Sequence, residues 1–221
     1  RDPSEGPAFQ PLKGSAWAGF QQVIASPYLL GISGYILFYT LTGTFAYLIQ
    51  GAVIASLEQN LGGRVQSFAY IDLATNTSSF LLQVFAVSRL VNRLGLGPTL
   101  SILPALTAAC FAALWAFPIY SVVLVTQVLR RATNYGLTRP AREMLFTPLP
   151  TEQKYKAKNF IDVALYRSGD TATSLLYLKL KSLGLVLSNL AAVAIPLSLL
   201  WLAIVPPLAR AYQTRTNPPP E

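Results

Sequence analysis

Long apolar segments, separated by short breaks rich in Gly, Pro or charged residues, dominate the pattern of this chain. The six longest lie at residues 28–57, 66–90, 98–117, 118–146, 157–180 and 183–208. A helix needs about 20 mainly apolar residues to cross the hydrocarbon core of a bilayer. Because the segments lack the strict polar–apolar alternation of barrel strands, the pattern predicts an all-α, polytopic membrane protein with six transmembrane helices.

The regions outside these spans are polar. We expect three parts, a cytoplasmic lead-in, a six-helix transmembrane bundle and a cytoplasmic tail, at residues 1–27, 28–209 and 210–221. Within the lead-in, Trp17, Phe20 and Ile24 recur at helical spacing. This spacing indicates either a short helix in the plane of the membrane surface or an ordered approach to the first span.

Local signals mark the ends of the spans. The pair Gly62-Gly63 is expected to form a turn, and residues 152–158 a charged loop. Pro196 is expected to kink the sixth span. Because the chain opens on Arg1, we expect a processed product, a subunit or a fragment.

The charge distribution indicates an orientation. Hydrophobic residues make up 52% and charged residues 12% of the chain, about half the charged fraction of an ordinary soluble domain. With both termini on one side, that side carries eleven basic residues: Arg1, Lys13, Arg89, Arg93, Arg139, Arg142, Lys154, Lys156, Lys158, Arg210 and Arg215. The other side carries three: Arg64, Lys179 and Lys181. This bias predicts cytoplasmic termini. The net charge of +8 arises mainly from this bias of basic residues toward one side of the membrane. Nucleic-acid binding would need these charges on one soluble face, so it is not expected.

Chemistry-bearing residues are scarce. The chain contains no His and a single cysteine, Cys110, inside an apolar run. Zinc, haem and Cys–His sites each need ligands or partners that this composition does not supply. We therefore predict no cofactor, no metal site and no enzymatic activity, and we interpret Cys110 as a small buried hydrophobic residue.

Four of the six spans carry a polar face at helical spacing, whereas the third and sixth contain no charge. The faces comprise Tyr39, Gly43, Ala46, Tyr47 and Gln50; Asp72, Thr75, Asn76, Ser79 and Gln83; Arg131, Asn134, Tyr135, Thr138 and Arg142; and Asp162, Tyr166, Gly169, Asp170, Thr173 and Tyr177. Four helices with one inward polar face each can enclose a water-filled path. Alternatively, the polar residues hold the helices together.

The charges at membrane depth favour an anionic cargo. The cations are Arg130, Arg131 and Arg167, and the acids are Asp72, Asp162 and Asp170. Arg167 and Asp170, three residues apart, can pair along one helix. The planar guanidinium suits phosphate or carboxylate. The alternative is that the arginines form interhelical salt bridges or gates, and this alternative is favoured for Arg130 because it lies off the face of Arg131.

The six-helix pattern resembles half of a major facilitator transporter, in which each half has six helices and the third and sixth are peripheral. Residues 89–98, Arg-Leu-Val-Asn-Arg-Leu-Gly-Leu-Gly-Pro, resemble the basic, Gly-containing cytoplasmic turn of that superfamily. The termini and the charge bias resemble the C-terminal half.

One longer stretch is more specific. Residues 134–149 read Asn-Tyr-Gly-Leu-Thr-Arg-Pro-Ala-Arg-Glu-Met-Leu-Phe-Thr-Pro-Leu, and a Lys-rich segment, Asp162-Val163 and Arg167-Ser168-Gly169 follow. This stretch resembles the ATP/ADP carrier family, the nucleotide translocases of plastids and intracellular bacteria, and their wider bacterial relatives. The translocases carry a glutamate at the position of Gln50 and Lys-Ser-Gly-Gly at residues 167–170, so the chain looks more like a bacterial relative.

These features predict half of a transporter that moves an organic anion, such as a nucleotide, by alternating access. We expect the path to be lined by Arg131, Arg142, Asn134, Tyr135, Asp72, Asn76, Gln50, Asp162, Arg167 and Asp170. The expected partners are the lipid bilayer and a missing N-terminal half or other membrane subunits, and the expected location is a bacterial or organelle inner membrane. The alternative is a structural subunit with a transporter-derived fold in a larger membrane complex.

Overall fold

The computed structural model describes residues 16–57 and 60–216. Every element in this part of the chain is a helix, which confirms the all-α prediction. In chain order the helices are α1 (Ala16–Ala25), α2 (Pro27–Leu57), α3 (Leu61–Phe85), α4 (Val87–Leu94), α5 (Leu96–Ala116), α6 (Tyr120–Thr133), η1 (Asn134–Thr138), α7 (Arg139–Met144), α8 (Thr151–Asn159), η2 (Phe160–Leu165), α9 (Tyr166–Ser182) and α10 (Leu187–Thr216). Most of the polar lead-in and the end of the tail, at 1–15 and 217–221, lie outside the described residues.

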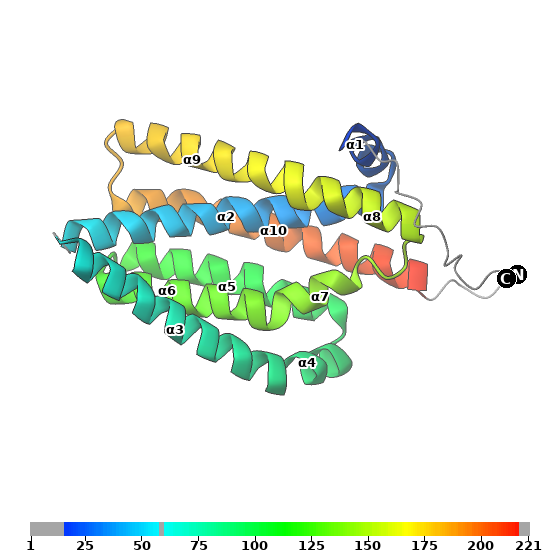
Figure 1. Ribbon diagram of the computed structural model, residues 1–221, viewed down its shortest axis with the longest axis horizontal. Coiled ribbons are helices and arrows are strands. Elements are labelled where there is room, and N and C mark those ends of the chain that lie inside the picture. The colour runs from blue at the N-terminus through cyan, green and yellow to red at the C-terminus, as the bar shows by residue number, and fades with distance from the viewer. Residues whose placement is uncertain (1–15, 58–59, 217–221) are drawn as a thin grey trace, which may run out of the picture.

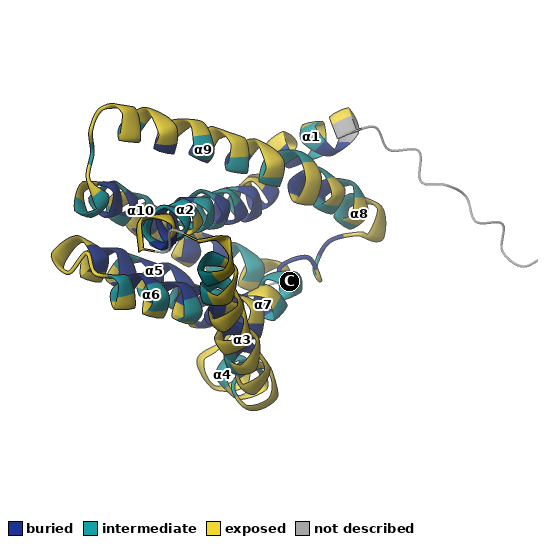
Figure 2. Cartoon of the chain, turned by 60° about the vertical axis from the view of Figure 1, so that its left-hand side comes forward, coloured by how far each residue is buried: buried dark blue, intermediate teal, exposed yellow. Residues whose placement is uncertain are grey.

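The long helices run side by side along one axis of the molecule (Figure 1). α2 and α10 lie in its interior, whereas α3, α4 and α9 are largely exposed (Figure 2). α10 packs against both α5 and α2. Gly97 of α5 permits the first of these contacts, because a Cβ at Gly97 would lie 2.8 Å from the Cβ of Ala209.

The core between α2, α5 and α10 is built around Trp201, which is fully buried. Its ring contacts that of Tyr35 at 5.3 Å between centroids. The Tyr35 hydroxyl donates a hydrogen bond of 3.0 Å to the carbonyl of Leu100, so a polar tip in the core is satisfied by the backbone of α5. These contacts fix the two apolar helices against α2.

Two of the long helical segments, which we call rods, are interrupted by a π-helical turn. α6, η1 and α7 form one continuous rod, and α8, η2 and α9 form another. A π-helical turn accommodates extra backbone within an α-helix, changes the phase of the side chains that follow, and is frequent at functional sites. Both interruptions lie in rods that the sequence pattern predicted as polar spans.

Two local predictions were wrong. Gly62 and Gly63 do not form a turn but lie in the first turn of α3, which begins at Leu61 because the side chain of Asn60 accepts a 2.6 Å hydrogen bond from the Gly63 N–H. Residues 152–158 are not a loop but part of α8. A Glu152–Lys156 ion pair four residues apart, with the acid near the N-terminus of α8 and the base near its C-terminus, supports this helix.

Within the described residues, three helices are long and apolar enough to cross a membrane: Pro27–Leu57, Leu96–Ala116 and Leu187–Thr216. These are the first, third and sixth predicted spans. The other three predicted spans are helical too, but they carry charged and polar residues, and π-helical turns divide the fourth and fifth into shorter α-helices. The count of six crossings therefore stays a prediction.

The short helix in the lead-in is present as α1, which crosses the end of the bundle rather than running along it (Figure 1). It packs against α8 and η2. Gly19 allows the close approach, since a Cβ there would lie 2.7 Å from the Lys156 carbonyl oxygen. Trp17 and Ile24 remain exposed.

Candidate functional site

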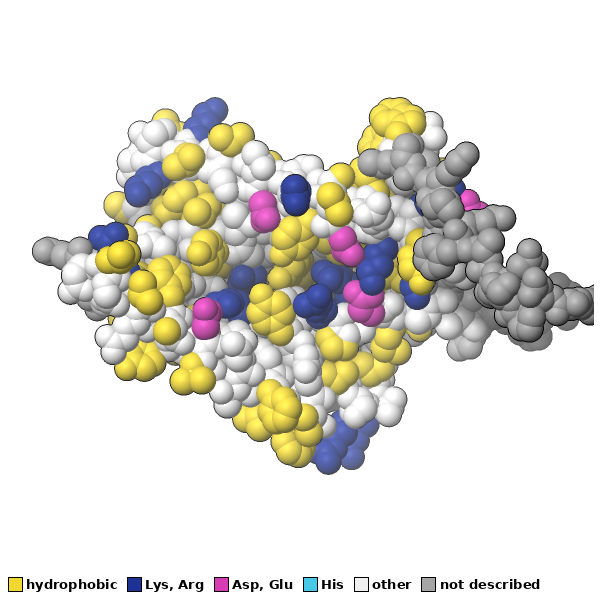
Figure 3. Space-filling model, in the orientation of Figure 1, with side chains coloured by type: hydrophobic (Ala, Val, Ile, Leu, Met, Phe, Trp, Pro, Cys, Tyr) yellow, Lys and Arg dark blue, Asp and Glu magenta, His cyan; other side chains and the backbone are white. Residues whose placement is uncertain are grey.

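A groove runs between α2 and α9 on one side and the α6–η1–α7 rod on the other. In Figure 3, Lys and Arg side chains gather with a few acids in the hollow of this face, between α9 and α3. Two adjoining cavities form the groove. We call them the central cavity, of about 470 Å³, and the end cavity, of about 450 Å³.

Both cavities are lined by polar and aromatic residues. The central cavity is lined by Tyr39, Thr40, Gly43, Thr44, Tyr47, Leu48, Gln127, Arg130, Arg131, Tyr135, Tyr166, Asp170 and Ser174. The end cavity is lined by Tyr39, Asn134, Tyr135, Arg139, Arg142, Glu143, Lys158, Asp162 and Tyr166. Three tyrosines therefore belong to both, at the boundary between them.

The tyrosines at this boundary are held by neighbours from three rods. The rings of Tyr39 and Tyr166 lie 6.2 Å apart. The amide of Asn134 donates a 2.9 Å hydrogen bond to the Tyr39 hydroxyl, and the guanidinium of Arg142 lies 6.0 Å from the centre of the Tyr39 ring. Aromatic faces and a cation thus meet where the two cavities join.

Among the described residues, four of the eight charged residues that line the groove have an ion-pair or hydrogen-bond partner on a neighbouring helix. Arg131 forms a 2.7 Å ion pair with Asp72 of α3, and Lys158 forms a 2.6 Å ion pair with Glu143 of α7. Asp170 accepts a short hydrogen bond from the hydroxyl of Thr44. These contacts tie α6 to α3, α7 to α8 and α2 to α9.

Arg130 differs from these groups because it is buried without a charged partner in the part of the chain described. It is 5% exposed, and its Nη2 donates only a long, 3.4 Å hydrogen bond to the carbonyl of Gly43. Its Nε and Nη1 have no hydrogen-bond partner. The side-chain amide of Gln127, three residues earlier, is 1% exposed and is likewise unpartnered.

The π-helical turn η1 positions the floor of the groove. Gly136 lies directly against α3, where a Cβ would come within 2.6 Å of the Cβ of Leu82 and 2.9 Å of the carbonyl oxygen of Ser79. The side chain of Gln83 donates a 2.9 Å hydrogen bond to the carbonyl of Tyr135. A backbone acceptor inside η1 is thereby satisfied by a side chain of the neighbouring helix.

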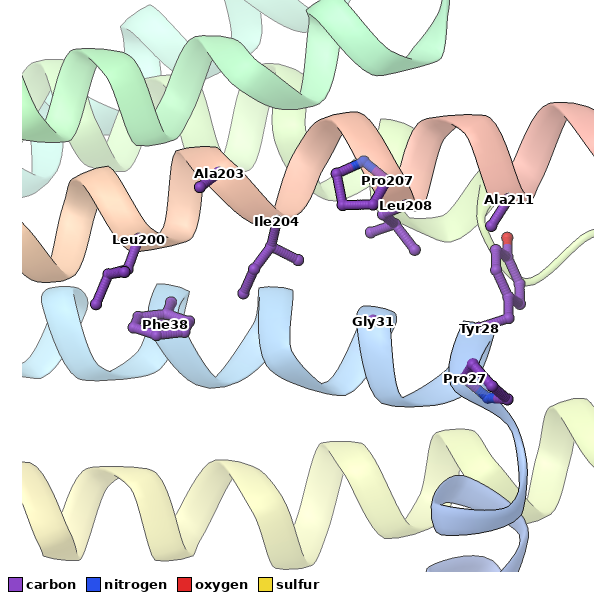
Figure 4. Close-up of a pocket in the computed structure, with 10 residues that line it drawn as sticks. All are labelled: Pro27, Tyr28, Gly31, Phe38, Leu200, Ala203, Ile204, Pro207, Leu208 and Ala211. Carbon is purple, nitrogen blue, oxygen red and sulfur yellow. The ribbon is translucent and has the colours of Figure 1, made fainter.

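A third cavity, between α2 and α10, has a different character. Its volume is also about 470 Å³. Figure 4 shows it bordered by Phe38, Leu200, Ile204 and Leu208, with no charged group among the side chains drawn. Such a surface suits lipid chains or packing rather than recognition of a charged molecule.

Comparison with known proteins places the chain in a family. Residues 99–212, from α5 to α10, match the family described as TLC ATP/ADP transporter. The chain belongs to the TLC ATP/ADP transporter family. It is 27% identical over 239 aligned residues to ADP,ATP carrier protein 2 of Chlamydia trachomatis serovar D, across 93% of this chain and 43% of that protein. The chain thus spans less than half the length of this relative. No solved structure matches it.

This membership confirms the resemblance to the ATP/ADP carriers and the prediction of an integral membrane protein. The family description is that of a transporter, which points to a carrier. Membership does not favour the alternative of a structural subunit. The family match covers both π-helical rods and therefore the basic side of the groove.

The structure brings together six of the ten residues predicted for the path. Arg131, Tyr135 and Asp170 line the central cavity, and Asn134, Arg142 and Asp162 line the end cavity. A seventh, Asp72, reaches the groove only through its ion pair with Arg131.

The remaining three lie elsewhere. Gln50 is fully buried in α2 with an unpartnered amide, and Asn76 and Arg167 are exposed; none of them lines the groove. Arg167 and Asp170 do not form an ion pair, and Asp170 accepts a hydrogen bond from Thr44.

One prediction about the arginines was wrong. Arg130 was favoured to form an interhelical salt bridge, but that salt bridge is made by Arg131, and both arginines line the central cavity. Adjacent residues on a helix point about 100° apart, so which of the two reaches Asp72 depends on the rotation of α6, which a polar stripe alone does not define.

Sequence reasoning also missed several lining residues of the TLC transporter groove. Gln127 sits in an apolar stretch, Arg139 and Lys158 were counted only as basic residues near the membrane surface, and Glu143 was noted only as part of a motif. The Glu143–Lys158 pair spans a helix–helix connection, so helical spacing carries no signal for it. The motif at residues 134–149, which includes Glu143, was the available clue.

Proposed function

We propose that this chain is the six-helix C-terminal half of a transporter of the major facilitator type, which moves a nucleotide or a related organic anion across a membrane. The observation that carries the proposal is the groove itself, with arginines and tyrosines on opposed rods. The name of the Chlamydia relative, an ADP,ATP carrier, supports a nucleotide as the cargo.

The arginines supply the attraction for the anion. Arg142 in the end cavity has no carboxylate partner among the ion pairs of the described residues and lies over the Tyr39 ring. Arg131 lines the central cavity although it also pairs with Asp72. A cargo phosphate can compete for such half-exposed cations, and the tyrosines offer faces on which a base can stack. Asp162 and Asp170 serve as counter-ions or proton sites.

The groove is open along one face, which is why we propose a second six-helix unit. α3 and α9 flank the opening and expose large apolar side chains, including Leu73, Phe80 and Leu175. A second unit seated on these flanks would close the groove into a path, and rocking of the two units would open it to either side in turn. The same proposal places both termini on the cytoplasmic side of a bacterial or organelle inner membrane.

The test is exchange of labelled nucleotide by the complete polypeptide in proteoliposomes loaded with unlabelled nucleotide. We expect saturable uptake that falls about tenfold in Arg142→Gln, because removal of one charge-assisted contact costs about 1.5 kcal/mol or more. Arg93→Gln removes the same charge from exposed α4, away from both cavities, and is the matched control.

Uptake that is equal in Arg142→Gln and Arg93→Gln would exclude the end cavity as the path. Absence of exchange for every nucleotide tested, in a protein that is folded and inserted, would exclude nucleotide transport.

A further inference from the structure

The central cavity holds a cation that the protein itself leaves without a counter-charge. Burial of a guanidinium is unfavourable unless its donors find acceptors. Two of the donor nitrogens of Arg130, Nε and Nη1, find none among the described residues, and the third makes only the 3.4 Å contact to Gly43. Nη2 lies between these two nitrogens on the planar fork and carries two hydrogens, so an oxyanion can bind Nη2 together with either Nε or Nη1.

The acids near Arg130 are already engaged. Asp170, which lines the same cavity, accepts from Thr44 on α2. Asp72 pairs with the neighbouring Arg131 on the α3 side of α6. The described part of the chain therefore supplies no carboxylate to Arg130, and an anion in the cavity can supply the missing acceptor.

Gly43 sets the position of the Arg130 side chain. A Cβ at this position would lie 3.3 Å from Nη1 and 3.6 Å from Nη2 of Arg130. Because glycine has no Cβ, the guanidinium can lie against the backbone of α2, where Nη2 donates to the Gly43 carbonyl. From this position Arg130 lines the cavity between α2 and α6.

Gln127 adds a neutral donor to the same place. It stands one helical turn before Arg130 on α6 and lines the same cavity, with both amide atoms buried and unpartnered. A buried amide without partners is rare, because each lost hydrogen bond is costly. An anion bound by Arg130 would give the Gln127 amide an acceptor as well.

We propose that Arg130 and Gln127, with Gly43 behind them, form a seat for one oxyanion group of the cargo, a phosphate or a carboxylate, in the central cavity. This inference rests on the proposed function, since it assigns a place to the charged end of the transported anion. Arg130 binds the group directly, Gln127 is a second donor, and Gly43 is a positioning residue.

The experiment is a binding series on the purified complete polypeptide in nanodiscs. ATP, ADP, AMP, adenosine, pyrophosphate and citrate are titrated by calorimetry against the wild type, Arg130→Gln, Arg130→Lys, Gln127→Leu and the control Arg93→Gln. We expect Arg130→Gln to weaken every oxyanion ligand about 10- to 100-fold and to leave adenosine unchanged, because only the charge-assisted fork is removed. Arg130→Lys keeps the charge without the fork and should be intermediate.

Gly43→Ala separates the seat from a purely structural role of the arginine. The added Cβ would lie 3.3 Å from Nη1, so the guanidinium must shift by a few tenths of an ångström while its charge remains. Oxyanion affinity should therefore fall while thermal unfolding stays within a few degrees of the wild type. If Arg130→Gln does not fold, Arg130→Lys and Gly43→Ala decide the question alone, and wild-type affinity in both would overturn the proposal.

The outcomes separate the two proposals. ATP binding that is equal in the wild type, Arg130→Gln and Gln127→Leu overturns the seat and leaves nucleotide transport intact. Binding of pyrophosphate or citrate that depends on Arg130, without binding of any nucleotide, supports the seat and overturns the nucleotide as cargo. No binding of any oxyanion to the wild type overturns the seat.

Discussion

Helix α2 borders two cavities of the same volume, about 470 Å³, whose linings have opposite chemistry. On one side, apolar residues of α2 and α10 face each other, and on the other, Arg130, Arg131 and Asp170 surround the central cavity. Volume therefore does not distinguish a packing defect from a binding site in this molecule. The feature that distinguishes them is a set of unsatisfied polar groups that converge on only one of the two cavities.

The helices on the two sides of α2 also differ in their continuity. α5 and α10 contain prolines, at Pro104, Pro196, Pro206 and Pro207, yet remain single α-helices. The rods α6–η1–α7 and α8–η2–α9 are the ones broken by π-helical turns. The comparison predicts that changes on the α10 side alter stability, whereas changes on the groove side alter stability and transport together.

The largest effect is expected at Trp201, the centre of the apolar side. Trp201→Ala removes the fully buried ring that packs on Tyr35 and should lower the free energy of unfolding by about 3–5 kcal/mol. Thermal unfolding in detergent measures it. Trp115→Ala, at a residue that is 55% exposed, is the control and should change stability little in detergent. Equal losses in the two variants would contradict the assignment of this core.

Gly97 and Gly136 test the comparison directly. Gly97 permits a close helix contact on the α10 side, and Gly136 permits one on the groove side. Gly97→Ala presses on Ala209, and Gly136→Ala presses on α3, so each should cost about 1–3 kcal/mol. Gly51→Ala is the control, since a Cβ there meets nothing within 4 Å.

A measurement of transport then distinguishes the α10 side from the groove side. Uptake per folded molecule should persist in Gly97→Ala and fall in Gly136→Ala, which moves η1 and the residues beside it. If both variants transport equally well per folded molecule, the groove does not depend on the packing of η1.

A smaller effect is expected where a side chain supports the π-helical turn. Gln83→Leu removes the donor to the Tyr135 carbonyl and should cost about 1 kcal/mol. Hydrogen exchange of the amides at residues 134–138 should quicken in this variant. Gln66→Leu, on the same helix but bonded only to Tyr70, should leave that exchange unchanged.

The smallest effect is expected at the Arg131–Asp72 pair. The two side chains are 25% and 52% exposed, so Asp72→Asn should change the free energy of unfolding by less than about 1 kcal/mol. Uptake should change less than in Arg142→Gln. A drop in uptake as large as that of Arg142→Gln would mean that Asp72 itself belongs to the path.

The helices and the polar faces were predictable because apolar length and helical spacing are properties of local sequence. Thr75 and Ser79 of the second polar face are indeed buried. The choice of Arg131 rather than Arg130 for the interhelical salt bridge was not predictable, because it depends on how α6 is rotated against α2 and α3. The helical form of residues 152–158 was missed for another reason: a charged segment was taken for a loop although its ion pair favours a helix.

The two π-helical turns have a consequence for how the length of this chain can vary. A π-helical turn holds extra backbone relative to an α-helix, so it can be regarded as an insertion of one residue. Deleting one residue at 134–138 would restore an α-helix and rotate everything after it by about 100° relative to α6. Arg142 would then leave the groove while the rod kept its composition. In an alignment, a one-residue gap at either turn should therefore identify relatives that have lost this groove more reliably than a substitution within it.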